Sequence, residues 1–194
     1  MKFSKFCDIT KKYPNEKVQV FIDQANLYKV LKRKYENYQV NYKKLALRLL
    51  GGRKLIRINI YVSTLNPEYE PEPSKSQHAW ISFLQSTDSV TVKTRPLRYT
   101  PNKQRDREKG IDILLATDML QQAYVDGYDT MILISGDGDY APVLEEIKKM
   151  GKRVENAFLK ESRSNALRSV CDVFIDLDKN VLSDCLIKKA GPRN

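Results

Sequence analysis

The chain contains one histidine, three cysteines and no apolar run approaching the roughly 18 residues that span a bilayer. His78 alone cannot build a histidine-rich metal site, and we interpret it as an ordinary polar residue on a helix. Cys7, Cys171 and Cys185 are odd in number and far apart, which argues against a disulfide framework and against a CxxC zinc site. The N-terminus also lacks the apolar core of a signal peptide. We therefore expect a soluble, cytoplasmic protein with free thiols.

Positive charge is what the chain has in excess. Its 34 Lys and Arg residues exceed its 24 Asp and Glu residues, giving a formal charge of +10. This charge favours a polyanionic partner such as nucleic acid, an anionic membrane surface or another acidic molecule, and charge alone does not choose among them. A length of 194 residues suits one domain. We expect that domain at residues 18–178, between an N-terminal arm (1–17) and a C-terminal tail (179–194).

Short apolar runs alternate with helical patterns along the chain. Apolar runs without polar alternation are typical of strands buried on both faces of a parallel sheet. We expect strands at residues 18–22, 55–62, 90–93, 131–134, 153–159 and, as the last strand, 173–177. Helices are expected at residues 24–34, 42–50, 111–123, about 142–151 and 164–170, and a short one in the tail. Asn41 is the expected cap of the helix at 42–50. A further helix is expected from Ser74 or Ser76 to residue 85, after a loop at 63–73. The expected fold class is therefore α/β, with helices on both sides of a central, mostly parallel sheet.

Acidic side chains occur at three places where a parallel sheet would gather them. Asp23 follows the first strand, Asp137 and Asp139 follow the strand at 131–134, and Asp112 begins the helix at 111–123. Ligands of open α/β sheets bind outside the carboxyl ends of the strands. Crowded carboxylates repel each other unless a cation neutralises them, and oxygen ligands of this kind suit Mg²⁺ or Mn²⁺. Acids that hold such an ion, in a basic protein, predict a nuclease.

Each acid also has a purely structural interpretation. Asp23 and Asp137 can serve as turn residues, Asp139 as a helix cap, and Asp112 as a charge favoured by the helix dipole. Asp118 lies deep in the apolar part of the same helix as Asp112, where an unpaired carboxylate is costly, so it needs a partner or a metal. With about 3.6 residues per turn, Asp118 cannot share the helix face of Asp112.

Residues 95–110 form a basic, proline-containing segment that we expect to be a mobile loop. It can be either a solvated surface loop or an arm that grips phosphates, and the sequence leaves both interpretations open. The basic residues that we expect to contact nucleic acid are Lys29, Arg33, Arg95, Arg98, Lys103, Arg105, Arg107 and Lys109, with Lys32 and Lys34 beside the first two. Tyrosines near these segments can either stack on unpaired bases or pack: Tyr28, Tyr35, Tyr38 and Tyr99.

Three ordered motifs resemble those of the NYN domain, a branch of the PIN-like ribonuclease superfamily that includes the LabA-like proteins. They are FIDQANL (21–27), KGIDILLATDM (109–119) and ILISGDGDYAPVLEEIKKMGKRV (132–154). The resemblance spans about residues 17–177 and implies a PIN-like fold with the first strand central, and metal-dependent cleavage of RNA. It implies Mg²⁺ or Mn²⁺ ligands at Asp23, Asp112, Asp137 and Asp139, with supporting roles for Asn26, Asp118 and Ser135. Gln24 departs from the pattern, since many relatives carry a small residue there.

The sequence hypothesis is a Mg²⁺- or Mn²⁺-dependent endoribonuclease that acts on single-stranded RNA, with homodimer formation left open. A first alternative is an RNA-binding module of the same fold with little or no catalytic activity. A second is a nucleotide-sugar glycosyltransferase, suggested by the DGD triplet. The chain is short for that enzyme class, and the other two motifs favour the nuclease.

Overall fold

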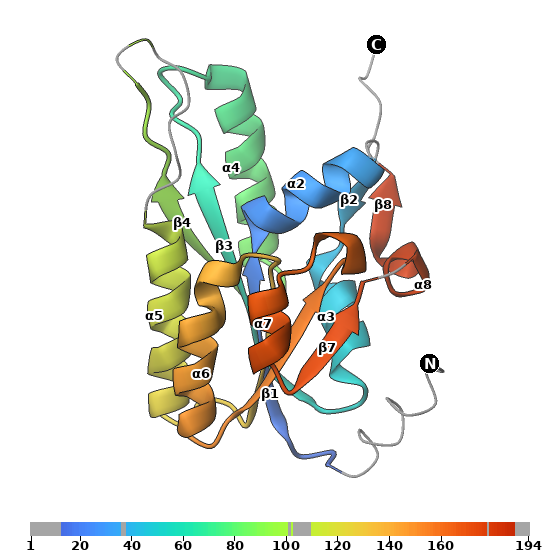
Figure 1. Cartoon of the computed structure of the whole chain (residues 1–194). Coiled ribbons are helices and arrows are strands. Elements are labelled where there is room, and N and C mark those ends of the chain that lie inside the picture. Colours follow the sequence, from blue (N-terminus) through green and yellow to red (C-terminus); the bar gives the residue numbers. More distant parts are fainter. Residues whose placement is uncertain (1–12, 36–37, 101, 103–109, 178, 189–194) are drawn as a thin grey trace.

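Six parallel strands form the central sheet of the computed structural model, which describes residues 13–35, 38–100, 102, 110–177 and 179–188 (Figure 1). Strand β1 (Lys17–Asp23) lies between β3 (Lys54–Thr64) and β5 (Thr130–Ile134). The sheet continues to the edge strand β4 (Val90–Pro96) on one side, and through β6 (Arg153–Phe158) to β7 (Val173–Asp176) on the other. The expected α/β class and the central place of the first strand are confirmed.

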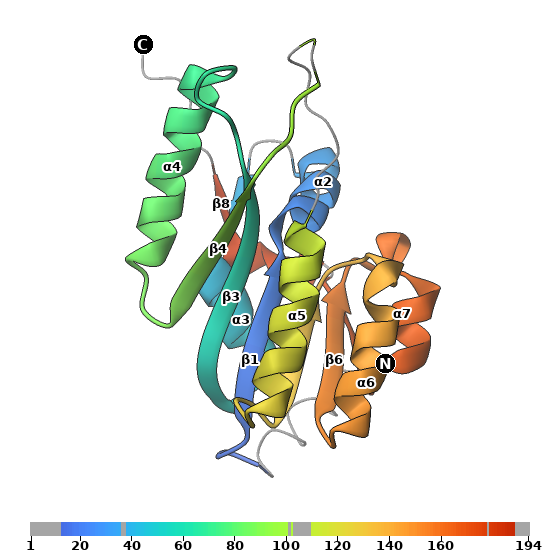
Figure 2. The same cartoon turned by 90° about the vertical axis from the view of Figure 1, so that its left-hand side faces the viewer.

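Helices cover both faces of this sheet (Figures 1 and 2). On one face pack α2 (Gln24–Lys34), α3 (Tyr42–Leu50) and α4 (Pro71–Gln85), and on the other pack α5 (Ile111–Tyr124), α6 (Ala141–Lys149) and α7 (Asn165–Val170). Successive residues of a strand point to opposite faces, so Val20 and Ile22 belong to the first core and Phe21 to the second. Each fully buried Ile or Leu contributes about 1.5–3 kcal/mol of hydrophobic stabilisation.

Several helix boundaries follow local signals that the sequence analysis used. Asn41 caps α3 by accepting a hydrogen bond from the Lys44 N–H, and α3 ends at Gly51, whose positive φ of 57° favours glycine. Ser164 caps α7 in the same way. Pro142 lies in the first turn of α6, as expected, where its missing N–H has no helical partner to lose.

Three expectations about the elements were wrong. Strand β4 runs to Pro96, so the first two residues of the loop expected at 95–110 belong to the sheet. Helix α4 begins at Pro71 rather than behind Ser74 or Ser76, because Pro71 and Pro73 both fit the first turn of a helix. The loop predicted at 63–73 therefore ends three residues earlier than expected. Strand β7 is not the last strand: β8 (Leu186–Lys188) pairs antiparallel with β2 (Tyr38–Val40) in a small second sheet. Both strands have three residues, too few to show a period in the sequence.

The ends of the chain are described in part. The short helix expected in the tail is α8 (Lys179–Leu182), which buries Val181 and Leu182. Residues 1–12 of the predicted arm and residues 189–194 of the tail lie outside the described residues. Among the helices that the structure describes, none is both long and apolar enough to span a membrane.

Candidate metal and nucleic-acid site

The acidic residues singled out in the sequence meet at the carboxyl end of the central strands. Asp23 is the last residue of β1, Asp112 lies in the first turn of α5, and Asp137 and Asp139 follow β5. Strands β1 and β5 pair directly, with Ile22 opposite Ile134, so their terminal acids become neighbours. Helix α5 runs back along the sheet toward the start of β5, which brings its N-terminus to the same end.

Tyr140 connects two of these acids. Its hydroxyl lies 3.2 Å from Asp112 Oδ1 and 3.4 Å from Asp23 Oδ2, and its ring is buried. Burial and the charges of Asp23 and Asp112 raise the pKa of Tyr140, so the hydroxyl keeps its proton and acts as a donor. A single hydroxyl proton can satisfy only one of the two carboxylates at a time. Tyr140 was missed in the sequence analysis, although it directly follows the DGD triplet.

Ser135 and Asn26 hold the two strand ends together. The buried Ser135 Oγ donates a hydrogen bond to Asp23 Oδ2 (3.1 Å) and accepts one from the Asp137 N–H (3.1 Å). Asn26 Oδ1 accepts a hydrogen bond from the Gly136 N–H (2.9 Å), and the Asn26 N–H donates to Asp23 Oδ1 (3.1 Å). These contacts fix the β5 turn against the start of α2, so both residues are positioned to support the acids.

Two of the acids cap helical turns, as their purely structural interpretation predicts, but each uses only one carboxylate oxygen to do so. Asp23 is the N-cap of α2, and Asp137 is the N-cap of a short 3-10 turn (Gly138–Tyr140), where it accepts a hydrogen bond from the Asp139 N–H (3.0 Å). Asp139 itself lies within that turn, exposed, and is not its cap. Capping therefore accounts for Asp23 Oδ1 and Asp137 Oδ1 but not for the convergence of three segments.

Electrostatics set Asp112 apart. Partial burial raises the pKa of Asp112, the hydrogen bond from Tyr140 lowers it, and the charges of Asp137 and Asp139 raise it again, with a net increase above the ordinary value. An elevated carboxyl pKa means that the ionised form is disfavoured where it stands. A cation bound among these acids would remove that cost.

The donor set fits a hard divalent cation, because every candidate ligand is a carboxylate oxygen. The arrangement is open: in the described part of the chain, no three His, Cys, Asp or Glu side chains are grouped closely enough to form a ready metal site. Mg²⁺ typically keeps several waters and takes one or two carboxylates from the protein. Asp23, Asp112 and Asp137 are the residues that could hold such an ion, with Asp139 beside them.

Asp118 lies apart from this group. It is buried, accepts a hydrogen bond from the Tyr61 hydroxyl (2.8 Å) and forms an ion pair with Lys93 Nζ (2.6 Å). The partner that its burial required is therefore a tyrosine on β3 and a lysine on β4. These contacts attach α5 to the sheet, so Asp118 helps to fix the helix whose first turn carries Asp112.

The predicted nucleic-acid contacts are described in part. Lys29 and Arg33 are exposed on α2 and, with Tyr28 and Lys32, line a shallow cavity of about 500 Å³. Arg95 and Arg98 are exposed at and beyond the end of β4. Lys103, Arg105, Arg107 and Lys109 lie outside the described residues.

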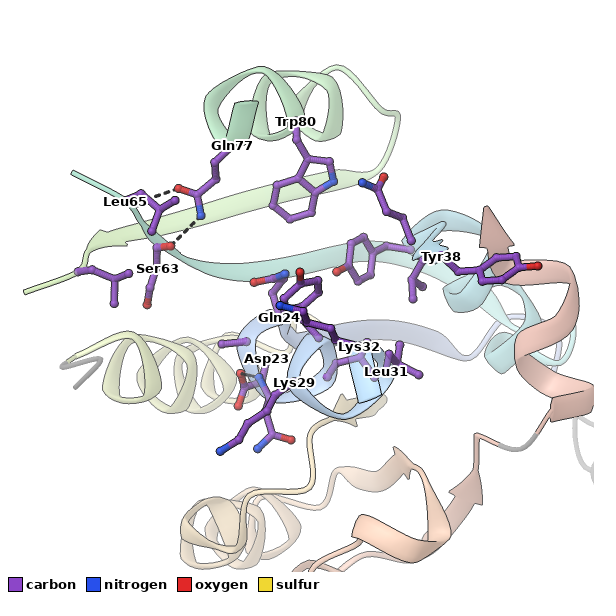
Figure 3. Close-up of a pocket in the computed structure, with 18 of the residues that line it drawn as sticks. Asp23, Gln24, Lys29, Leu31, Lys32, Tyr38, Ser63, Leu65, Gln77 and Trp80 are labelled. Atoms are coloured by element: carbon purple, nitrogen blue, oxygen red, sulfur yellow. Dashed lines mark hydrogen bonds between the residues drawn. The ribbon is translucent and has the colours of Figure 1, made fainter. Parts of the chain in front are cut away.

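A larger cavity, of about 730 Å³, opens directly beside the acids (Figure 3). Asp23, Asp112 and Asp137 line one part of it, and it continues between α2, α4 and β2 to aromatic residues that include Trp80. The candidate site is thus the acidic end of a groove, rather than an isolated cluster.

The central parallel sheet, with acids gathered at the carboxyl ends of its strands, is an α/β fold consistent with a PIN-like NYN domain. Residues 17–178 match the NYN domain, and the chain belongs to this family of the PIN-like nuclease superfamily, whose members are generally nucleases. A crystal structure of a protein of unknown function from Vibrio parahaemolyticus has the same fold, with a TM-score of 0.67 and 20% identity over 89% of this chain and 97% of that chain. Among curated proteins, none matches the chain.

Proposed function

We propose that the protein is a cytoplasmic endoribonuclease of the LabA-like branch that cleaves single-stranded RNA with Mg²⁺ or Mn²⁺. The observation that carries the proposal is the convergence of Asp23, Asp112 and Asp137 from three separate segments at one end of the sheet. Capping and helix-dipole effects explain one acid at a time and give no reason for the three to share a cavity. The net positive charge favours the polyanionic substrate.

The acids would hold the ion, and neighbouring residues would keep them in place. Asp23, Asp112 and Asp137 act as ligands and Asp139 assists. When bound, the ion activates a water and neutralises charge that develops on the phosphate. Tyr140 holds a proton between Asp23 and Asp112.

The exposed basic residues would engage the RNA backbone. Lys29 lies on α2, whose N-cap is Asp23, and it lines the same cavity as the acids, while Arg33 continues the basic surface along the helix. Arg95 and Arg98 extend the basic surface from β4. Backbone contacts of this kind position a strand without reading its sequence.

The first experiment measures cleavage of a labelled single-stranded RNA and the matching DNA with Mg²⁺, Mn²⁺ or EDTA. The parent protein is compared with Asp137→Asn and with a matched control, Asp184→Asn, whose carboxylate pairs with Arg48 on the surface. We expect metal-dependent cleavage of RNA by the parent and by Asp184→Asn, and its loss in Asp137→Asn. Mg²⁺ should also raise the unfolding temperature of the parent but not of Asp137→Asn, because binding to the folded state alone stabilises it.

The RNA-binding module is the second candidate, and the open arrangement of the acids favours it. Equal RNA binding by the parent and Asp137→Asn, without cleavage under any metal, would establish it and exclude the nuclease. The glycosyltransferase is set aside, because its DGD triplet falls within the stretch that matches the NYN domain.

A further inference from the structure

The groove beside the acids is lined in part by aromatic side chains. Trp80, Tyr28, Tyr38 and Tyr42 line the 730 Å³ cavity together with Asp23 and the other acids. This volume lies within the range of about 300–1,000 Å³ that is typical of small-molecule sites. The groove is therefore large enough to admit a nucleotide next to the acidic end.

Trp80 is held in a defined position on the α4 side of the groove. Its ring packs on Tyr42 with centroids 6.2 Å apart and planes tilted by 60°. In Figure 3 the indole points from α4 into the space above α2, toward the side where Gln24 and Lys32 lie. A half-buried indole packed against Tyr42 thus borders the cavity, within reach of a base that enters it.

Tyrosines on the other walls are accessible. Tyr28 on α2 and Tyr38 on β2 expose 44% and 42% of their surfaces and both line the cavity. Lys32 Nζ lies 5.9 Å from the centroid of the Tyr28 ring, so positive charge and an aromatic face occur together on α2. A strand with its phosphates along α2 would direct its bases toward the aromatic walls.

Most side-chain amides of the groove are already engaged within the protein. Gln77 donates to the Ser63 carbonyl (3.0 Å) and accepts from the Leu65 N–H (2.8 Å), and Gln24 is hydrogen-bonded to Tyr42. Asn26 accepts from the Gly136 N–H. Gln39 is the remaining amide in the lining. With most of these amides engaged, the aromatic side chains are the part of the lining that suits any base, because every base has a face that can stack.

We propose that this groove holds an unpaired base of the RNA strand, stacked on Trp80, next to the phosphate that the acids act on. The position of that phosphate rests on the proposed function, whereas the base site does not. A base in a duplex is already paired and stacked, so double-stranded RNA is excluded from the groove. Because stacking dominates, the site tolerates different bases.

Trp80 is the single tryptophan of the chain, so its fluorescence reports on the groove directly. The full-length Asp137→Asn protein, which leaves the strand intact, is titrated in Mg²⁺ with hexauridylate, hexaadenylate and a six-residue abasic ribose-phosphate strand. Duplex RNA and single nucleoside monophosphates are the other arms. We expect both hexamers to quench the fluorescence, and the abasic strand and the duplex to leave it unchanged.

Substitutions identify the contact independently of the fluorescence. Binding of end-labelled hexamers, followed by anisotropy, should weaken about 5- to 150-fold in Trp80→Ala, the contribution of stacking one base, and should stay near the parental value in Trp80→Phe. Tyr28→Ala, a surface change that keeps the tryptophan, should weaken binding as well. Phe83→Ala is the matched control, because Phe83 is on the same helix, 68% exposed and outside the cavity lining.

Three outcomes would overturn the base site. Equal quenching by the abasic strand would show that phosphate contacts alone cause the signal. If Trp80→Phe and Trp80→Ala both bound the hexamers as tightly as the parent, Trp80 would not contact the base. Mononucleotides that quench as well as the hexamers would assign the groove to a free nucleotide. Quenching without cleavage by the parent supports the base site and overturns the nuclease, whereas cleavage without quenching does the reverse.

Discussion

The two ends of the central sheet use acidic residues in opposite ways. At the amino end, where the strands begin, each buried or half-buried acid forms an ion pair with a basic side chain. Arg53 donates to both oxygens of Glu155 at 2.9 Å, and Lys148 pairs with Asp172 at 2.8 Å. At the carboxyl end, Asp112, Asp137 and Asp139 form no ion pair within the described residues. The acids of the amino end are therefore paired with cations inside the protein, whereas these three acids of the carboxyl end are held, in the described part of the chain, by hydrogen bonds alone.

The pKa values follow the same division. Burial alone would raise the pKa of Asp172, but the hydrogen bonds from Lys148 and from the Val154 N–H, with the charges of Lys148 and Arg153, hold it below its ordinary value. The pKa of Asp112 is raised, because burial and two neighbouring acids outweigh the hydrogen bond from Tyr140. One carboxylate stabilises the folded state, and the other costs it stability.

The largest expected effect is on catalysis at the carboxyl end. Asp112→Asn should reduce metal-dependent RNA cleavage by at least about 100-fold, as removing one electrostatic group from an active site commonly does. The fold should not be weakened, because the substitution removes a disfavoured charge. Initial rates of RNA cleavage and the unfolding temperature are measured on the same preparations. Cleavage at parental rates by Asp112→Asn would end its assignment as a ligand.

The amino end should respond in stability instead. Glu155→Gln leaves the Arg53 guanidinium buried, with 2% of its side chain exposed, and should cost about 3 kcal/mol. This is the low end for a broken buried ion pair, because Arg53 keeps Glu16 and the carbonyls of Leu49 and Leu50. Urea unfolding measures the loss, and the protein that remains folded should cleave RNA at the parental rate.

A double substitution separates the ion pair from simple packing. Arg53→Met with Glu155→Leu removes both charges and should recover most of the stability lost in Glu155→Gln, because two apolar side chains need no desolvated partner. A double variant that is less stable than Glu155→Gln would show that the pair stabilises the fold beyond compensating its own burial.

A glycine at the carboxyl end connects packing with the site. A Cβ at Gly136 would lie 2.6 Å from Phe158 Cδ1 and 2.7 Å from the Ser162 carbonyl oxygen, so Gly136→Ala must displace the turn that carries Asp137. We expect an overpacking cost of about 1–3 kcal/mol together with a loss of cleavage. Gly138→Ala is the matched control, since its Cβ would meet the Ser164 Oγ (2.8 Å), the end of a side chain. Equal cleavage by both variants would contradict the dependence on the turn.

The acids were predictable from the sequence because strand, turn and helix signals are local. Asp23 and Asp137 follow apolar runs, and parallel strands gather such residues at one end. The same holds for the Asn41 cap and the end of α3 at Gly51. Local signals were not sufficient everywhere, because α4 begins at Pro71 and not behind Ser74 or Ser76.

The remaining features depend on contacts between distant segments. Tyr140 reads as an ordinary helix-start residue, and its place between Asp23 and Asp112 depends on the crossing of α5 over the sheet. The partner of Asp118 comes from β3 and β4, at positions with no acidic or basic motif. The aromatic groove likewise combines α2, α4 and β2, and β2 is a three-residue strand held by the C-terminal β8.

The smallest expected effect is the most direct test of the two ends. In EDTA at neutral pH, Asp172→Asn should lower the free energy of unfolding, and Asp112→Asn should raise it. A carboxyl with a lowered folded pKa contributes stability above its ordinary pKa of 3.8 and loses it as pH falls through the folded value. A carboxyl with a raised folded pKa has the opposite sign: it has no effect on stability below the ordinary pKa of 3.8, and its cost grows as pH rises from 3.8 to the folded value.

As the pH is lowered, the free energy of unfolding of each variant should therefore approach that of the parent, from above for Asp112→Asn and from below for Asp172→Asn. Urea unfolding of the parent, Asp112→Asn and Asp172→Asn in EDTA between about pH 3 and pH 8 measures them, within the range where carboxyl groups titrate. Adding Mg²⁺ at neutral pH should then stabilise the parent and Asp172→Asn but leave Asp112→Asn unchanged, since only the first two keep the ligand. Two variants that shift stability in the same direction would show that the acids at the two ends of the sheet are electrostatically alike, and the division between cohesion and ligand binding would fail.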